Sequence, residues 1–423
     1  MREHRVTSLS NGVRVASEEM RGLRSVALGV FVRVGSRDED AGVAGISHFI
    51  EHLLFRGTAT HGALAIAQIF DRFGAELNAA TSREFTEIYA RVIDTHLPEA
   101  FSVIGGMVRS PTWGDLDAER EVVLEEIAMY DDAPDDLVHD LIGEAVFPND
   151  PLGRPVIGLA EVIERLTVDE IGVHHGRYYT APNVVVAAAG SVDHDRLVAL
   201  VESELGALAA TGAPDRPLLA NGSSPIRSFL SRDTEQYHVC LGAPGISRHD
   251  DRRFAATLLD QILGGGASSR LFQEIRERRG MAYAVYSYGS HYDETGQVGV
   301  YVGTREENVE ECLAVIGSEI ASVASGALEP DELERAKDAL KGRLALSMES
   351  TAARMGRLGK ALLLGSELLD EDELAQRIDA VSEADVAELA GAMFDPARLS
   401  AAGIGPDEAV FSRAVDALVA ESV

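Results

Sequence analysis

An internal repeat is the sequence feature that most constrains the fold of this chain. Near the middle, the apolar run 183–190 predicts a buried strand, and an amphipathic helix over 193–205 follows it. Near the end, 398–405 and 406–420 show the same two patterns in the same order. The same succession of a strand and a helix, over more than twenty residues, therefore occurs twice in the chain.

The segments that lead into these strands also match. A short helical pattern precedes each strand, over 168–177 in one case and over 383–393 in the other. A proline then stands just ahead of each strand, Pro182 and Pro396. The repeat thus extends beyond the strand and its following helix.

The two halves begin alike as well. The run 25–32 predicts a strand that leads through a polar loop into a helix carrying His48. The run 237–242 predicts the equivalent strand, and a helix over about 252–263 follows it. Both ends of the pattern are therefore duplicated.

Strands mixed with long helices in each half predict an α+β fold. We expect two homologous α/β-sandwich-like halves, each a mixed sheet with helices packed on it. The segment 211–224 is rich in Gly, Pro, Ala and Ser and has no apolar periodicity, so it predicts a linker. The expected division is a domain at 1–210 and a homologous domain at 225–423, which suits a chain too long for one core.

The composition excludes several classes of partner. Acidic residues outnumber basic ones by 69 to 38, which argues against nucleic acid and anionic membranes. The longest apolar runs, such as 184–189, are far shorter than the roughly 20 residues of a membrane helix. Two cysteines, Cys240 and Cys312, cannot form a disulfide framework and are expected to be small core residues of a cytoplasmic protein. The acidic surface would suit basic peptides, or it reflects a general bias towards solubility.

Two histidines one helical turn apart predict a metal site. His48 and His52 lie at i and i+4, so their side chains project from one face of a helix. Glu51 leaves the same helix about 100° around, beside the site, where it can take a proton from a zinc-activated water. This His-x-x-Glu-His order is the inverted form of a zinc-peptidase motif. The alternative is an ordinary surface helix that happens to carry two histidines.

A carboxylate from a second helix is expected as the third ligand. Glu119 and Glu126 are seven residues apart on one stripe, which makes one a candidate ligand and the other a carboxylate that orients a histidine. Glu121 and Glu125 are expected to be solvated. Three apolar residues predict the buried face of this helix, Val122, Val123 and Ile127. Two imidazoles and one carboxylate favour zinc over manganese or cobalt.

These residues resemble the pitrilysin, insulin-degrading enzyme and mitochondrial processing peptidase family. The matching segments are 48–58, 76–79, 81–82 and 119–126, and the likeness extends over essentially the whole chain, including the duplication. The resemblance implies that Glu126 is the third zinc ligand, with one Zn²⁺ per chain, and that Glu119 is the second acid. It also implies that the two halves form half a clamshell.

The second half has no histidine in 254–263, so no zinc is expected there. The resemblance implies that Arg276 and Tyr283 reach across to the substrate at the zinc. A phenol and a guanidinium suit the negative charge that develops on an attacked carbonyl. The alternative is a surface arginine and a core tyrosine.

A strand near the metal is expected to capture the substrate. The segment 77–81 has small side chains and precedes a second β-rich run, 85–92, so an extended peptide can add to it as a further strand. Asn78 and Ala79 are the candidate substrate-binding residues. For Asn78, a position in a turn is the alternative.

We therefore predict a cytoplasmic zinc endopeptidase or oligopeptidase that cleaves peptides or unfolded segments. The resemblance implies a homodimer, because this chain carries both the zinc motif and the Arg/Tyr pair. One alternative is a non-catalytic structural or chaperone-like relative, for which Glu51 would have no use. A zinc hydrolase acting on other substrates is a further alternative.

Overall fold

The computed structural model of the chain describes residues 4–212, 214, 216, 219, 224–395 and 398–420. Its contacts divide the chain into two compact units, each with its own sheet and core. Unit 1 comprises Met1–Ala128, Pro155–Pro217 and Ala345–Leu368. Unit 2 comprises Met129–Arg154, Leu218–Leu344 and Leu369–Val423.

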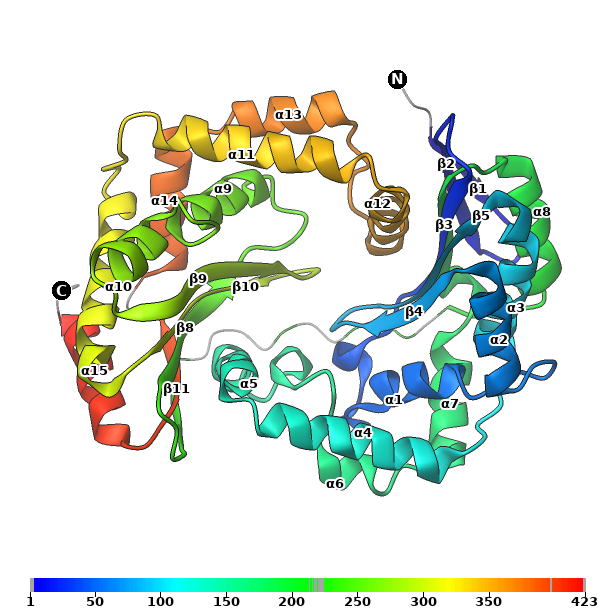
Figure 1. Cartoon of the computed structure of the whole chain (residues 1–423), viewed down its shortest axis with the longest axis horizontal. Helices are drawn as coiled ribbons and strands as arrows, with labels where there is room; N and C mark the ends of the chain where they lie inside the picture. Colours follow the sequence, from blue (N-terminus) through cyan, green and yellow to red (C-terminus); the bar gives the residue numbers. More distant parts are fainter. Residues whose placement is uncertain are drawn as a thin grey trace. The chain divides into compact units, whose positions relative to one another are not determined.

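The sheet of unit 1 has six strands (Figure 1). In spatial order they are β1 (His4–Ser8), β2 (Arg14–Glu19), β6 (Val184–Gly190), β3 (Ser25–Val32), β5 (Thr86–Ile93) and β4 (Glu76–Thr81). β2 and β6 run parallel, and every other neighbouring pair is antiparallel. β3 and β6 are apolar and buried along almost their whole length, as expected of strands covered on both faces.

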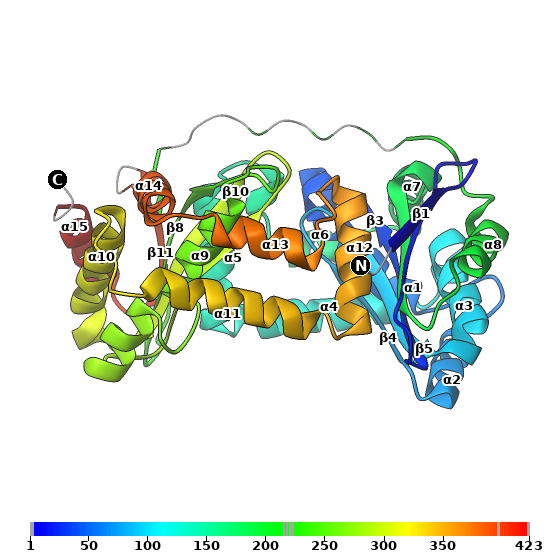
Figure 2. The same cartoon turned by 90° about the horizontal axis from the view of Figure 1, so that it is seen from above.

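Helices cover both faces of this sheet. The larger core lies under the helices of the first half of the chain, α1 (Ile46–Leu54), α2 (Ala63–Phe73), α3 (Leu97–Arg109), α4 (Leu116–Asp131), α6 (Ala160–Ile163), α7 (Val168–Tyr178) and α8 (His194–Leu205). The opposite face is covered by a helix from far along the sequence, α12 (Thr351–Leu364). Its Met355 and Leu358 pack with Phe31 of β3, and α12 lies beside β3 in both views (Figures 1 and 2).

The sheet of unit 2 repeats that of unit 1. Its five strands are β7 (Arg227–Ser231), β11 (Ser400–Gly405), β8 (Tyr237–Gly245), β10 (Gly296–Thr304) and β9 (Ala282–His291). β7 and β11 are parallel and the remaining pairs antiparallel, so the order and directions reproduce those of β2, β6, β3, β5 and β4. The predicted α+β fold with two equivalent mixed sheets is confirmed.

The helices of unit 2 also lie on two faces of its sheet. They are α5 (Pro134–Val146), α9 (Arg253–Leu263), a π-helical segment (Phe272–Arg278), α10 (Val309–Ala324), α11 (Glu332–Ser347), which ends in unit 1, α13 (Glu371–Asp379), α14 (Glu383–Met393) and α15 (Glu408–Ala420). α5 packs on β8 and β11, much as α12 packs on the sheet of unit 1. The two compact units therefore differ from the predicted halves by two helical segments. Met129–Arg154 of the first half belongs to unit 2, and Ala345–Leu368 of the second half belongs to unit 1. Each segment covers one face of the sheet in the unit that it joins. The division of the chain into homologous domains at 1–210 and 225–423 remains a prediction.

The predicted elements named above are confirmed, with ends that differ by at most three residues. Pro182 lies in the short 3₁₀ turn that precedes β6, whereas Pro396 lies outside the described residues. Cys240 and Cys312 are buried and free, as expected of small core residues. Within the described part of the chain, no helix has the length and apolar character required to cross a membrane.

Candidate metal centre

The N-terminus of α1 is held in place by a buried carboxylate. Glu39 accepts hydrogen bonds from the backbone N–H groups of Gly45 (2.7 Å) and Ser47 (2.8 Å). A negative charge at this end also suits the helix dipole. Gly45 has a φ of 94°, and a Cβ there would lie 2.7 Å from the Cα of Gly158, so the helix starts where only glycine fits.

One face of α1 is apolar and the other carries the predicted site. Ile46, Phe49, Ile50, Leu53 and Leu54 are buried in the core of unit 1. His48, Glu51 and His52 lie on the remaining face and are partly exposed. Burial of the apolar stripe therefore fixes the rotation of the helix and the direction of these three side chains.

The opposing helix, α4, supplies two carboxylates. Glu119, Val123 and Ile127 are buried, and Glu126 lies at the edge of this stripe with 39% of its side chain exposed. Val122 is 47% exposed, so its prediction as part of the buried face is wrong. It lies about 100° around the helix from Val123, which is enough to leave the core. Glu121 and Glu125 are exposed, as expected.

The three predicted ligands converge within unit 1. Each of His48, His52 and Glu126 offers one ligand atom, and these atoms lie within 4.8 Å of one another. An Oε2 atom of Glu126 is 3.3 Å from Nε2 of His52 and 3.8 Å from Nε2 of His48. The two imidazole rings meet edge to face, with centroids 4.7 Å apart.

Glu119 orients one of these imidazoles. Nδ1 of His52 donates to Oε1 of Glu119 at 2.8 Å, and Arg56 donates to the other oxygen of the same carboxylate. With its Nδ1 occupied in this way, His52 turns Nε2 towards Glu126. This is the carboxylate–histidine arrangement that commonly accompanies zinc ligands.

Burial also favours the neutral form of His48. Desolvation, assisted by the nearby His52, lowers the pKa of His48 to about 4. A neutral imidazole has the free lone pair that a metal ligand requires. At neutral pH, His48 is therefore ready to bind a metal without first losing a proton.

Glu51 lies beside the cluster with a hydrogen-bond partner of its own. Thr81, the last residue of β4, donates its hydroxyl to Oε2 of Glu51 at 2.6 Å. Burial raises the pKa of the Glu51 carboxyl, and the bond from Thr81 opposes that shift. A carboxylate with a raised pKa is a stronger base.

The donor set fits a catalytic zinc ion. Two imidazole nitrogens and one carboxylate oxygen are the ligands of many zinc hydrolases, which leave the fourth position open. Ligand atoms about 2.0–2.2 Å from a tetrahedral zinc lie roughly 3.3–3.6 Å apart. The separation of 3.3 Å between His52 and Glu126 falls in that range, and the separation of 3.8 Å between His48 and Glu126 is slightly longer.

The candidate substrate-binding residues lie at an edge of the sheet. β4 is the outermost strand, paired on one side with β5. Asn78 is exposed within this strand, so the alternative that placed it in a turn is wrong. Ala79 is buried, and its backbone N–H donates to Oδ1 of Asn78 at 2.9 Å.

Arg276 and Tyr283 lie together in unit 2. The guanidinium of Arg276 stacks 4.4 Å from the ring centroid of Tyr283 and 4.7 Å from that of Phe272, between two aromatic rings. Arg276 also donates to the backbone carbonyl of Tyr283 at 3.2 Å. Tyr283 is 76% exposed, so the alternative of a core tyrosine is wrong. Contact of this pair with a substrate stays a prediction.

Some residues around the site had no predicted role. Arg56 and Thr81 belong to the segments that carry the family resemblance, but their partners Glu119 and Glu51 were not foreseen. Arg56 lies two residues beyond the end of α1, so helical spacing from His52 does not predict its position. The capping carboxylate of Glu39 has no sequence signal either, because its bonds depend on how a loop folds back.

Family models match most of both halves. A model described as insulinase (peptidase family M16) matches residues 14–159, and one described as the peptidase M16 inactive domain matches residues 165–340. An uncharacterized zinc protease of Streptomyces coelicolor is 42% identical over 90% of this chain and 85% of its own length. A protein with the same description from Bacillus subtilis is 39% identical over 91% of this chain and 94% of its own length.

Solved structures share the fold. A protease from Helicobacter pylori superposes with a TM-score of 0.89 at 22% identity, covering 96% of this chain and 100% of that one. A peptidase M16 inactive domain from Pseudomonas fluorescens gives a TM-score of 0.88 at 23% identity, covering 96% of this chain and 98% of that one. At these identities the likeness concerns the fold alone.

Proposed function

Because this chain belongs to the insulinase family of zinc proteases, peptidase family M16, we propose that it is a zinc-dependent endopeptidase or oligopeptidase. The observation that carries the proposal is the convergence of His48, His52 and Glu126, with Glu51 beside them. Zinc, when bound, supplies the Lewis acidity that lets a water lose a proton near neutral pH.

Each residue of the cluster has a distinct part in this proposal. His48, His52 and Glu126 hold the one zinc ion of the chain, and Glu119 fixes the orientation of His52. Glu51 is the general base that takes the proton from the attacking water and passes it to the leaving amine. The hydrogen bond from Thr81 holds the Glu51 carboxylate in place, and the neutral hydroxyl adds no charge beside it.

The proposed substrates are peptides or unfolded segments. An extended chain can pair with the outer edge of β4 next to Asn78 and Ala79, which would bring its backbone beside Thr81, the residue that contacts Glu51. Arg276 and Tyr283 of the same chain are proposed to stabilise the negative charge on the attacked carbonyl. A homologous metal-free half at 225–423 would have this supporting role.

We also propose that the protein is a cytoplasmic homodimer. The resemblance implies pairing for chains of this length, and this chain holds both the zinc motif and the Arg/Tyr pair. The two free, buried cysteines suit a reducing compartment. Sedimentation of the purified protein is expected to give twice the chain mass, and a monomer at micromolar concentration would contradict the dimer.

A cleavage assay tests the proposed function directly. The purified chain is expected to cleave an unstructured basic peptide at an internal bond, and a chelator is expected to abolish the cleavage. Added Zn²⁺ should restore it. A chain that binds zinc but cleaves neither peptides nor unfolded proteins would favour the alternative of a structural or chaperone-like relative, and cleavage that survives complete removal of metal would exclude a zinc mechanism.

Tyr283→Phe is expected to lower kcat by roughly 10²–10³-fold, with zinc content and thermal stability unchanged. The side chain is largely exposed, so loss of its hydroxyl removes little packing energy. Initial rates, zinc analysis and thermal unfolding measure the three quantities.

Tyr286→Phe is a matched control for this experiment. Tyr286 lies in the same strand, is also partly exposed, and bonds to His139 at 2.9 Å. Its variant is expected to keep the wild-type kcat. Equal rates for wild type and Tyr283→Phe would exclude Tyr283 from the reaction.

A further inference from the structure

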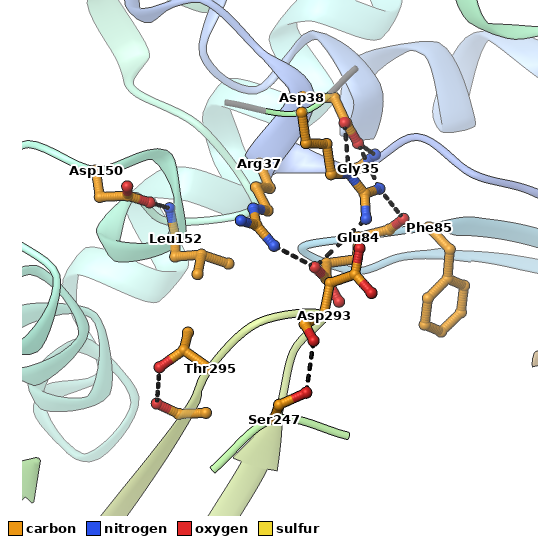
Figure 3. Close-up of polar contacts among 12 residues, drawn as sticks. Gly35, Arg37, Asp38, Glu84, Phe85, Asp150, Leu152, Ser247, Asp293 and Thr295 are labelled. Carbon is orange, nitrogen blue, oxygen red and sulfur yellow. Dashed lines mark hydrogen bonds and ion pairs between the residues drawn. The ribbon is translucent and has the colours of Figure 1, made fainter. Parts of the chain in front are cut away.

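The turn between β4 and β5 is fixed by a buried cluster of four charged side chains. Arg37 and Glu84 are 2% and 3% exposed, and Arg216 and Asp38 are 6% and 5% exposed. Figure 3 shows Arg37 and Asp38 beside Glu84, which belongs to this turn. Among the described residues, these four side chains carry two positive and two negative charges.

Arg216 binds two separate segments through its guanidinium. Its Nε and Nη2 atoms donate to the two carboxylate oxygens of Asp38 at 2.8 and 2.9 Å. Nη2 also donates to the backbone carbonyl of Glu84 at 2.6 Å, and Nη1 lies 3.3 Å from its carboxylate. Arg37 donates to that same carboxylate at 2.5 Å. This two-pronged geometry is specific to arginine.

The loop that carries Asp38 is packed directly on the turn. The backbone N–H of Ser36 donates to the carbonyl of Ser82 at 3.2 Å, and that of Arg37 donates to the carbonyl of Arg83 at 2.9 Å. A Cβ on Gly35 would lie 2.2 Å from the carbonyl oxygen of Ser82. The loop at 35–38 and the turn at 82–85 therefore form one closely packed body.

The packed loop and turn adjoin Thr81, the residue that contacts the proposed base, Glu51. Thr81 directly precedes the turn, and its hydroxyl bonds to Glu51 at 2.6 Å. Arg216 itself comes from neither segment. It lies in the stretch predicted as a linker, two residues before unit 2 begins at Leu218. The last described side chain of unit 1 before that boundary is thus bonded to the turn that carries Thr81.

We propose that Arg216 is a positioning residue for the proposed reaction, which holds Glu51 in its working orientation through the 82–85 turn and Thr81. The inference rests on the proposed function of Glu51 as the base. It gives Arg216, which lies in the stretch predicted as a linker, a role in the active site.

Two variants of the full-length zinc enzyme test this role. Arg216→Lys keeps the charge but loses the fork. Asp38→Asn combined with Arg216→Gln removes one pair of opposite charges together, so the net charge of the cluster does not change. Both variants are expected to lower kcat about 10–100-fold, with KM and zinc content near their wild-type values. Hydrogen exchange should rise at the amides of 82–86.

Arg5→Gln is the matched control. Arg5 makes a two-bond contact to Asp195 in the same unit, but that pair is exposed and far from β4 in the sheet order. This variant is expected to keep wild-type kcat and wild-type exchange in the turn.

A double-mutant cycle with Thr81→Val separates positioning from stability. If Arg216 acts through Thr81, the loss of kcat from Arg216→Lys should largely disappear in the Thr81→Val background. Equal losses in both backgrounds, or an unchanged kcat in both Arg216 variants of an active enzyme, would overturn the proposal. A wild-type chain that cleaves no peptide would instead overturn the function of Glu51 and, with it, this role of Arg216.

Discussion

Glu51→Gln is expected to lower peptide cleavage by several orders of magnitude while the chain retains its zinc. Loss of a general base typically costs 10²–10⁴-fold, and the cost is greater where the same group also generates the nucleophile. Glutamine keeps the size and a carbonyl oxygen for the bond from Thr81, but it cannot accept the proton of the attacking water. Turnover of a fluorogenic peptide and zinc per chain are the two measurements.

The control for this experiment is a carboxylate of the same unit that faces solvent. Glu121 is exposed on α4, and Glu121→Gln is expected to leave both rate and zinc content unchanged. If Glu51→Gln stays active, another group is the base. If it loses its zinc, Glu51 is a ligand, and its assignment as base is wrong.

Glu126→Gln is expected to weaken zinc binding by more than the roughly 10–100-fold that loss of an outer hydrogen-bond partner costs. The substitution removes the negative charge of the proposed third ligand, whose oxygen lies 3.3 Å from Nε2 of His52. Competition with a chromophoric chelator measures the affinity, and the rate at saturating zinc shows how much activity returns.

Glu125→Gln is the matched control, because Glu125 is the neighbouring residue on α4 and points to solvent. Its zinc affinity is expected to equal that of the wild type. Glu119→Gln should fall between the two, with most of the zinc kept and turnover reduced, since Glu119 bonds to Nδ1 of His52 and is proposed to orient it. Equal affinities for the Glu126 and Glu125 variants would remove Glu126 from the ligand set.

Short-range periodicity accounts for what the sequence predicted well. His48 and His52 share a helical face because they are four residues apart, and Glu119 and Glu126 share a stripe because they are seven apart. The structure brings these side chains together as expected. The repeat of strand order in the two sheets was likewise visible as a repeat of local patterns.

Contacts between segments that lie far apart in the sequence could not be predicted from it. The bond from Thr81 to Glu51 depends on how β4 lies against α1, and nothing in the spacing of the two residues reports that distance. The position of α12 on the sheet of unit 1 is a similar case, since α12 lies far along the sequence from the strands that it covers. The prediction that Val122 is buried was wrong for a local reason, because an apolar residue at the margin of a helical stripe can face either the core or the solvent.

The position of β4 as the outermost strand of its sheet, among the described residues, has a consequence for how substrates would be distinguished. A strand that adds there is held by backbone groups, which nearly every residue carries, so the edge would respond to the conformation of a chain and hardly to its sequence. A folded protein has already used those groups internally and would be passed over, whereas the same protein after unfolding would be accepted. Proline is the exception, because it has no N–H to donate: it would be tolerated only at alternate positions, those whose N–H points away from β4.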